Sequence, residues 1–387
     1  MKKIIGLPAA CATIALLAVS AFASTPGTES LIQDQCTPEN KLAWYNEFRQ
    51  TFKTDQAKAF DLASKYLACP AAAGEEQITS YLKNFVTLYQ KSARKGQVAD
   101  LVYNKKDYAK AFELGRQVLA EEPDYLKTHI DLGYAGYFAA ISGNTSFLND
   151  SMTYSAKALE MIQAGKAPDD WKPFSGKDET IAWMNFIIGT GKITNAPADA
   201  IPFFIKAATI EGPFKKSAQT YSLLGQAYEV GVYAKQFEEY NRLYKDKPET
   251  PESKLALENI NQVIDRVIDA YARAVALAGT DPKNQKIKDE SLKSLTTWYK
   301  FRNNDSDAGL TEMVAGIMSK PLPPQPTPIT SLPAASPGST SGAGSTNAGS
   351  GQGTAAATPA ATPKPSASQA ATKPGSTTSN PSGPGRP

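Results

Sequence analysis

Residues 107–137 read DYAKAFELGRQVLAEEPDYLKTHIDLGYAGY. In both halves of this stretch apolar side chains recur at spacings of three and four, which is the periodicity of an amphipathic helix. We therefore predict one helix from Asp107 to Ala120 and another from Leu126 to Ile141. Pro123 lies between them and ends the first helix, because proline has no backbone N–H to continue it. The stretch indicates an all-α protein.

Parts of this pattern occur again along the chain. The phrase AKAF at 109–112 is also found at 57–60, and the Leu-Gly pair at 132–133 returns at 224–225. With Pro70 and Pro123 after the second helices, these phrases resemble the tetratricopeptide repeat, a two-helix unit of about 34 residues. The resemblance implies an α-α superhelix, a solenoid of stacked helical hairpins in which each unit covers its neighbour's apolar stripe. The units fall at 40–70, 92–123, 126–163, 180–213 and 218–248.

The rest of the folded body is predicted to be helical as well. Residues 252–278 contain no helix breaker and have apolar side chains at helical spacing, so they predict one long helix. Two shorter helices are expected near 285–301 and 307–318. Residues 164–178 hold two prolines and two glycines and predict a long connection. We expect the solenoid to occupy residues 24–319.

The two ends of the chain have a different composition. Residues 1–23 combine Lys2 and Lys3, an apolar run and the small-x-small triplet at 21–23, which is the pattern of a secretory signal peptide. An uncleaved membrane anchor is the alternative. Residues 320–387 are rich in Pro, Ser, Thr, Ala and Gly, and predict a disordered tail. We therefore expect export to a periplasmic or extracellular location, with no stable membrane span after signal cleavage.

Cys36 and Cys69 remain once the signal peptide is removed. Cys36 precedes the first helix of a hairpin and Cys69 ends the second, so an antiparallel arrangement brings them together. Export permits a disulfide between them. Two free thiols are the alternative.

The charge distribution bears on the partner. The net charge of +3 includes six basic and no acidic residues in segments 1–23 and 320–387, so the body between them is mildly acidic. A nucleic-acid reader would show a basic patch on its folded part, so no nucleic-acid partner is expected. The lack of acidic groups in the basic tail allows a contact with anionic cell-wall material, and the alternative is that the tail is a flexible solvated end.

Groups that carry catalysis are scarce. His129 is the single histidine, and it lies on the packing face with Leu132, so no catalytic residue, metal site or cofactor is predicted. The favoured function is a non-enzymatic scaffold that binds a protein or peptide partner. The alternative is a helical cell-envelope enzyme that uses paired carboxylates on a glycan, with Glu121-Glu122 and Asp169-Asp170 as the visible pairs.

In the repeat family, one face of each first helix lines a concave groove. The resemblance therefore implies a partner-binding groove that is aromatic towards the N-terminus, formed by Trp44, Phe48, Ile130, Tyr134, Tyr137, Phe138, Met184 and Gln226. Aromatic side chains offer a large contact area at a small entropic cost. The alternative is that the protein's own helices fill this groove.

Overall fold

The computed structural model describes residues 36–332. The predicted signal peptide and most of the predicted tail lie outside the described residues. Within 36–332 the regular structure is entirely helical, without a strand, which confirms the all-α prediction. The chain divides into two compact units after Ala93, whereas the sequence predicted one continuous body from 24 to 319.

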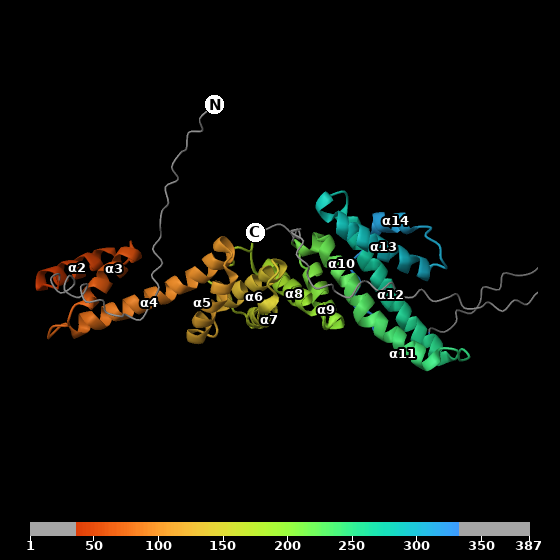
Figure 1. The fold of residues 1–387 in the computed structure, drawn as a ribbon, viewed down its shortest axis with the longest axis horizontal. Helices are drawn as coiled ribbons and strands as arrows, with labels where there is room; N and C mark the ends of the chain where they lie inside the picture. Colours follow the sequence, from red (N-terminus) through yellow and green to blue (C-terminus); the bar gives the residue numbers. More distant parts are fainter. Residues whose placement is uncertain (1–35, 333–387) are drawn as a thin grey trace, which may run out of the picture. The chain divides into compact units, whose positions relative to one another are not determined.

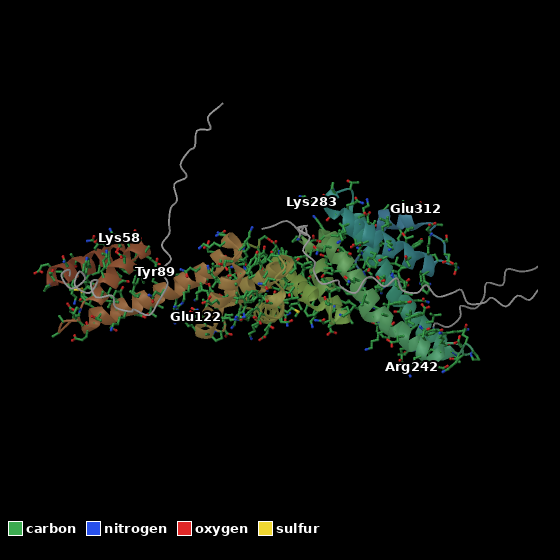
Figure 2. The ribbon with its side chains drawn as sticks, viewed as in Figure 1. Lys58, Tyr89, Glu122, Arg242, Lys283 and Glu312 are labelled. Carbon is green, nitrogen blue, oxygen red and sulfur yellow. A yellow bond between two sulfur atoms is a disulfide. The ribbon has the colours of Figure 1, made fainter. Side chains whose placement is uncertain are left out.

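The first unit contains α2 (Pro38–Thr51), α3 (Gln56–Ala68) and the first part of α4 (Glu76–Asp100). The side chain of Thr37 accepts a hydrogen bond from the Asn40 backbone and so caps α2. A disulfide joins Cys36 to Cys69 with Cα atoms 5.5 Å apart, as predicted. The core gathers Phe48, Leu62, Tyr66 and Leu82, and Tyr89, labelled in Figure 2, stacks on Phe60 at a centroid distance of 4.6 Å.

The division within α4 has a simple cause. The core of the first unit ends with apolar side chains near Val86, and a separate core begins at Val98. Between them, residues 90–96 read QKSARKG, a run without a large apolar side chain. The helix itself continues through Gly96. The helical pattern of the sequence is continuous here, so it does not show that the two cores are separate.

The second unit begins with a series of helices of ordinary length. After the π-helix η1 (Leu101–Lys105), Lys106 adopts a left-handed conformation and turns the chain into α5 (Tyr108–Glu121). The following elements are α6 (Leu126–Ile141), η2 (Thr145–Phe147), α7 (Leu148–Gln163), α8 (Lys177–Lys192), α9 (Pro197–Thr209) and η3 (Phe214–Lys216). α6 packs on both α7 and α8, and α8 packs on α9. The predicted connection 164–178 is confirmed as non-helical before Lys177.

The last predicted repeat unit differs from its prediction. α10 (Ala218–Gln226), the π-helix η4 (Ala227–Tyr233) and α11 (Ala234–Tyr244) follow one another with helical backbone angles at both junctions, so the chain makes no turn there. The helical hairpin predicted for 218–248 is therefore wrong. A Cβ at Gly231 would lie 2.3 Å from the backbone nitrogen of Ala198, so glycine is present because α9 begins against it, and it does not mark a turn.

The predicted long helix is confirmed as α12 (Pro251–Ala278), which begins with a capping box between Thr250 and Ser253. Figure 1 shows α12 running alongside α11. Helix α12 also packs on α10, η4 and α13. The remaining elements are η5 (Pro282–Asn284), α13 (Gln285–Arg302), α14 (Leu310–Gly316) and η6 (Ile317–Ser319).

The packed chain does not end at 319. Residues 320–332, which we call the proline-rich segment, run along α12 and donate or accept hydrogen bonds with three of its side chains. Leu322 packs against the core of the second unit. The prediction of a disordered tail from Lys320 is therefore wrong for this segment, and residues 333–387 lie outside the described part.

Candidate functional site

Three long polar side chains of α12 hold the proline-rich segment. Asn259, Arg266 and Arg273 are separated by seven residues each, so they follow one face of the helix with a drift of about 20° per step. We call this the α12 face. Each of the three donates a side-chain hydrogen bond to a backbone carbonyl of the segment. The face therefore binds the backbone of an extended chain.

Asn259 forms hydrogen bonds with both the carbonyl and the N–H of Ile329. Its Nδ2 donates to the carbonyl of Ile329 at 3.1 Å, and its Oδ1 accepts from the Ile329 N–H at 2.7 Å. A side-chain amide that pairs with a backbone amide in this way takes the place of a neighbouring β-strand. Asn259 therefore fixes the direction and position of the segment at Ile329.

The two arginines bind carbonyls nearer the beginning of the segment. Arg266 donates from Nε to the Pro324 carbonyl at 2.7 Å. Arg273 donates from Nη2 to the carbonyls of Lys320 and Pro321, at 3.1 and 2.8 Å. The segment thus runs antiparallel to α12.

Arg273 is 2 % exposed, which is unusual for a guanidinium. Asp269, one turn earlier, accepts hydrogen bonds from its Nε and Nη2 at 2.7 and 3.3 Å, so the charge is paired. The two carbonyls of the segment complete its partners. Since a buried charge is costly without such partners, the burial of Arg273 depends on the segment that covers it.

The sequence of the segment favours its extended shape. Prolines stand at 321, 323, 324, 326 and 328, and each fixes its own φ near −65°. The residue before each proline is also restricted to extended conformations. A polyproline II chain rises about 3.1 Å per residue, so Pro321 and Pro324 are about 9 Å apart, close to the roughly 10 Å between successive side chains of the α12 face.

The interval from Pro324 to Ile329 does not fit as closely. Five residues span about 15 Å in a polyproline II chain, while Arg266 and Asn259 are about 10 Å apart along α12. Gln325, Pro326 and Pro328 of this interval line a cavity of about 240 Å³. The chain spans this hollow without filling it.

Polar and apolar residues together line the cavity. Its floor is formed by α9, η4, α11 and α12, through Ala198, Ile201, Tyr228, Val232, Gln236, Asn259, Gln262 and Val263. The hydroxyl of Tyr228 and the Oε1 of Gln236 are buried and have no hydrogen-bond partner among the described residues. Neither atom is exposed to solvent, so Tyr228 and Gln236 line the cavity through their other atoms.

The π-helix η4 shapes this floor. It presents both Tyr228 and Val232 to the cavity, and π-helical turns are frequent at functional sites. Behind it, the Tyr271 hydroxyl donates to Glu229 at 2.7 Å. Burial raises the pKa of the Glu229 carboxyl, although the hydrogen bond from Tyr271 opposes this. Burial also raises the pKa of the Tyr228 phenol, so that group stays protonated and can donate.

The residues predicted to line a partner-binding groove lie outside the α12 face. In the first unit Phe48 is buried against Phe85, with ring centroids 4.9 Å apart, and Trp44 packs against the same core. In the second unit Ile130, Tyr137 and Met184 are between 0 and 2 % exposed. These side chains are part of the core, so they do not form the surface of an open groove.

The cause is the packing around α6. Tyr134 contacts Phe174 of the connection 164–178 and Trp183 of α8, at centroid distances of 5.8 and 5.3 Å. Phe138 lies half-buried beside the same tryptophan. Aromatic rings of the connection 164–178 and of α8 thus occupy the expected groove of the second unit, in place of the helices near Glu75 and Glu252 that the sequence offered as the alternative. Gln226 is exposed at the end of α10 and does not line the cavity.

Sequence reasoning missed the α12 face, although two signals for it exist. Asn259, Arg266 and Arg273 keep an exact spacing of seven residues on a helix that is otherwise apolar on one side. The prolines of 320–328 also follow one another too regularly for an ordinary flexible end. Neither signal indicates by itself that the two stretches meet.

The groups considered for chemistry are engaged in other contacts. Glu121 and Glu122 form ion pairs with Arg94 and Lys95, each at 2.7 Å; Glu122 is labelled in Figure 2. Among 36–332, no cluster of three metal-binding side chains was found. Burial lowers the pKa of His129, whose Nε2–H donates to the Pro123 carbonyl at 2.8 Å.

The same described range contains no helix with the length and apolar character that a membrane crossing requires. Comparisons of the chain with protein-family models, curated proteins and solved structures gave no match.

Proposed function

We propose that the protein is an exported, non-enzymatic helical scaffold that binds a protein or peptide partner as an extended chain along the α12 face. The observation that carries this proposal is the set of hydrogen bonds from Asn259, Arg266 and Arg273 to the backbone of residues 320–329. Backbone contacts of this kind supply affinity in peptide recognition, while pockets for alternate side chains supply specificity.

Two further observations support a binding role. The contacts involve carbonyl groups, which every peptide carries, so the face does not depend on one side-chain sequence. The cavity beside the face supplies the pocket in which a partner's side chain is selected.

The proposed context follows from the sequence. The signal-peptide pattern at 1–23 and the Cys36–Cys69 disulfide support a periplasmic or extracellular protein. The repeated hairpins support a tetratricopeptide-like arrangement for residues 92–213, with α12 as the departure that supplies the site. The basic tail is the part we propose to contact anionic wall material.

A selection from a displayed library of random 13-residue peptides tests the binding role. The full-length chain is compared with a double variant, Asn259→Ala with Arg266→Ala, which removes two of the backbone contacts. We expect sequences that are enriched on the wild type and lost on the variant. A matched control, Lys286→Ala, removes an exposed charge on α13 away from the site and should keep every enriched sequence.

The proposal is contradicted if nothing is enriched, or if the same peptides bind the wild type and the double variant equally well. Unfolding curves of both variants establish that the loss of binding does not come from loss of the fold. Both substitutions are at half-buried positions of α12, so the helix should persist.

A further inference from the structure

We propose that the partner is a proline-rich peptide, and that residues 320–332 are a built-in competitor that occupies its site until a better-fitting peptide displaces them. This inference rests on the proposed binding role of the α12 face and adds the class of ligand and its regulation. It is carried by the composition of the bound segment and by the space that the segment leaves unfilled.

The hydrogen bonds explain why prolines are favoured. A proline keeps its carbonyl but has no N–H, and the arginines of the α12 face use carbonyls alone. Asn259 accepts from one N–H, that of Ile329, which is not a proline. A ligand can therefore have proline at most positions and lose no contact. Its preformed extended shape also lowers the entropic cost of binding.

The covalent connection makes the segment a competitor. The Lys320 N–H still bonds to the Ile317 carbonyl of η6, so the segment begins where the helical body ends. A tether this short gives an effective concentration on the order of millimolar. A free peptide with the same sequence therefore competes poorly against it.

The segment is nevertheless an incomplete ligand. Pro326 lines the cavity of about 240 Å³, but its ring carries no polar atom for the side chains of Gln236 and Gln262, which line the same cavity. A glutamine at this position is long enough to enter the cavity and carries both a donor and an acceptor. A partner with such a side chain gains hydrogen bonds that the segment lacks, and this difference permits displacement.

Fluorescence anisotropy with three labelled peptides tests the inference on the full-length protein. The first has the sequence of residues 320–332, the second replaces Pro326 by glutamine, and the third replaces every proline by alanine. The second should bind about tenfold more tightly than the first, since one or two net hydrogen bonds are worth about that factor. The third should bind at least about tenfold more weakly, because the unbound peptide is no longer extended.

Two protein variants complete the experiment. Replacing Pro321, Pro324, Pro326 and Pro328 by glycine keeps every carbonyl but loosens the segment, so all three peptides should bind this variant more tightly than the wild type. In Gln236→Leu the advantage of the glutamine peptide should become smaller, while the first peptide binds as before. Gln236 is half-buried, and its aliphatic replacement fits the apolar part of the cavity.

The outcomes separate the two proposals. Equal binding of the alanine and proline peptides, no gain from glutamine, or no gain in the glycine variant overturns the inference and leaves the binding role of the α12 face standing. A doubled mass of the wild type, from exchange of the segment between two copies, also overturns it. If none of the three peptides binds the wild type or any variant at the α12 face, which contains Asn259 and Arg266, the proposed function itself fails.

Discussion

At the scale of single residues, two glycines show what packing demands of the sequence. A Cβ at Gly225 would lie 2.9 Å from ring carbons of Tyr271 on α12, whereas a Cβ at Gly96 on α4 would meet nothing within 4 Å. Gly225→Ala should therefore lower the free energy of unfolding by about 1–3 kcal/mol, because the Tyr271 ring must shift within a buried contact. Gly96→Ala should raise it by up to about 1 kcal/mol through helix propensity. Urea unfolding measures both, and equal effects of the two substitutions would show that α10 does not pack closely on α12.

Glu75 gives a prediction about pH. Hydrogen bonds from the Ala72 backbone N–H and from Lys41 lower the pKa of its carboxyl in the folded state. The carboxylate therefore stabilises the fold above its unfolded-state pKa, and this contribution is lost as the pH falls through the lower folded-state value. Glu75→Gln should reduce the melting temperature of the first unit near neutral pH, and the difference should shrink as the pH falls below about 4.5. A difference that is constant with pH would contradict this account.

Single residues also show what the sequence can and cannot predict about the site. His129 was predicted to belong to the packing face, and it is 6 % exposed. Ile130, Tyr134 and Tyr137 were assigned to an open groove, because helical periodicity states which residues share a face but not what covers that face. Tyr134 and Tyr137 are covered by Phe174 and Trp183, more than thirty positions later, and no local pattern encodes those contacts.

At the scale of elements, the pair α2 and α3 depends on its disulfide. The bond closes a loop with a sequence separation of 33, and the chain-entropy model gives a loop of this size a value of roughly 3–4 kcal/mol. Reduction should lower the free energy of unfolding of the first unit by about that amount, since its core is small. Thiol labelling of the exported protein should detect neither Cys36 nor Cys69. Labelling of both without denaturant would disprove the pairing.

The rod formed by α10, η4 and α11 illustrates a limit of prediction at this scale. Gly231 and the valines around it resemble the end of a helix, and the repeat pattern places a turn there. The structure keeps the chain helical because Gly231 accommodates the backbone of Ala198. Two residues of this π-helix, Tyr228 and Val232, line the cavity. Local sequence signals do not distinguish a glycine in a turn from a glycine at a close contact.

At the scale of the whole molecule, the proline-rich segment changes where the folded protein ends. A chain that stops after Leu332 should unfold like the full-length protein. A chain that stops after Ser319 should lose about 1–3 kcal/mol, because Arg273 loses two carbonyl partners and the core loses Leu322. Urea unfolding followed by tryptophan fluorescence compares the three forms. Identical stability of all three would show that the segment does not pack on α12 in solution.

Composition explains why the sequence placed this boundary too early. Proline-rich stretches bury little surface of their own, so they are normally assigned to disordered ends. Here the partner surface is supplied by α12, whose three polar side chains bind backbone groups 47 to 70 residues later in the chain. The helices themselves follow from periodicity and breakers, which is why the all-α class and α12 were predicted correctly. The site arises from a long-range contact between two stretches that look unremarkable separately.

Hydrogen exchange at the backbone amide of Ile329 tests the central claim most directly, because this N–H donates to Asn259 across the α12 face. In the full-length protein the amide should exchange more slowly than that of Thr330, for which no such contact is present in the described structure, and Asn259→Ala should remove the difference. Saturation with the peptide that carries glutamine in place of Pro326 should release the segment and speed exchange at Ile329. Fast exchange at Ile329 in the wild type, or protection that persists while the peptide is bound, would contradict the account.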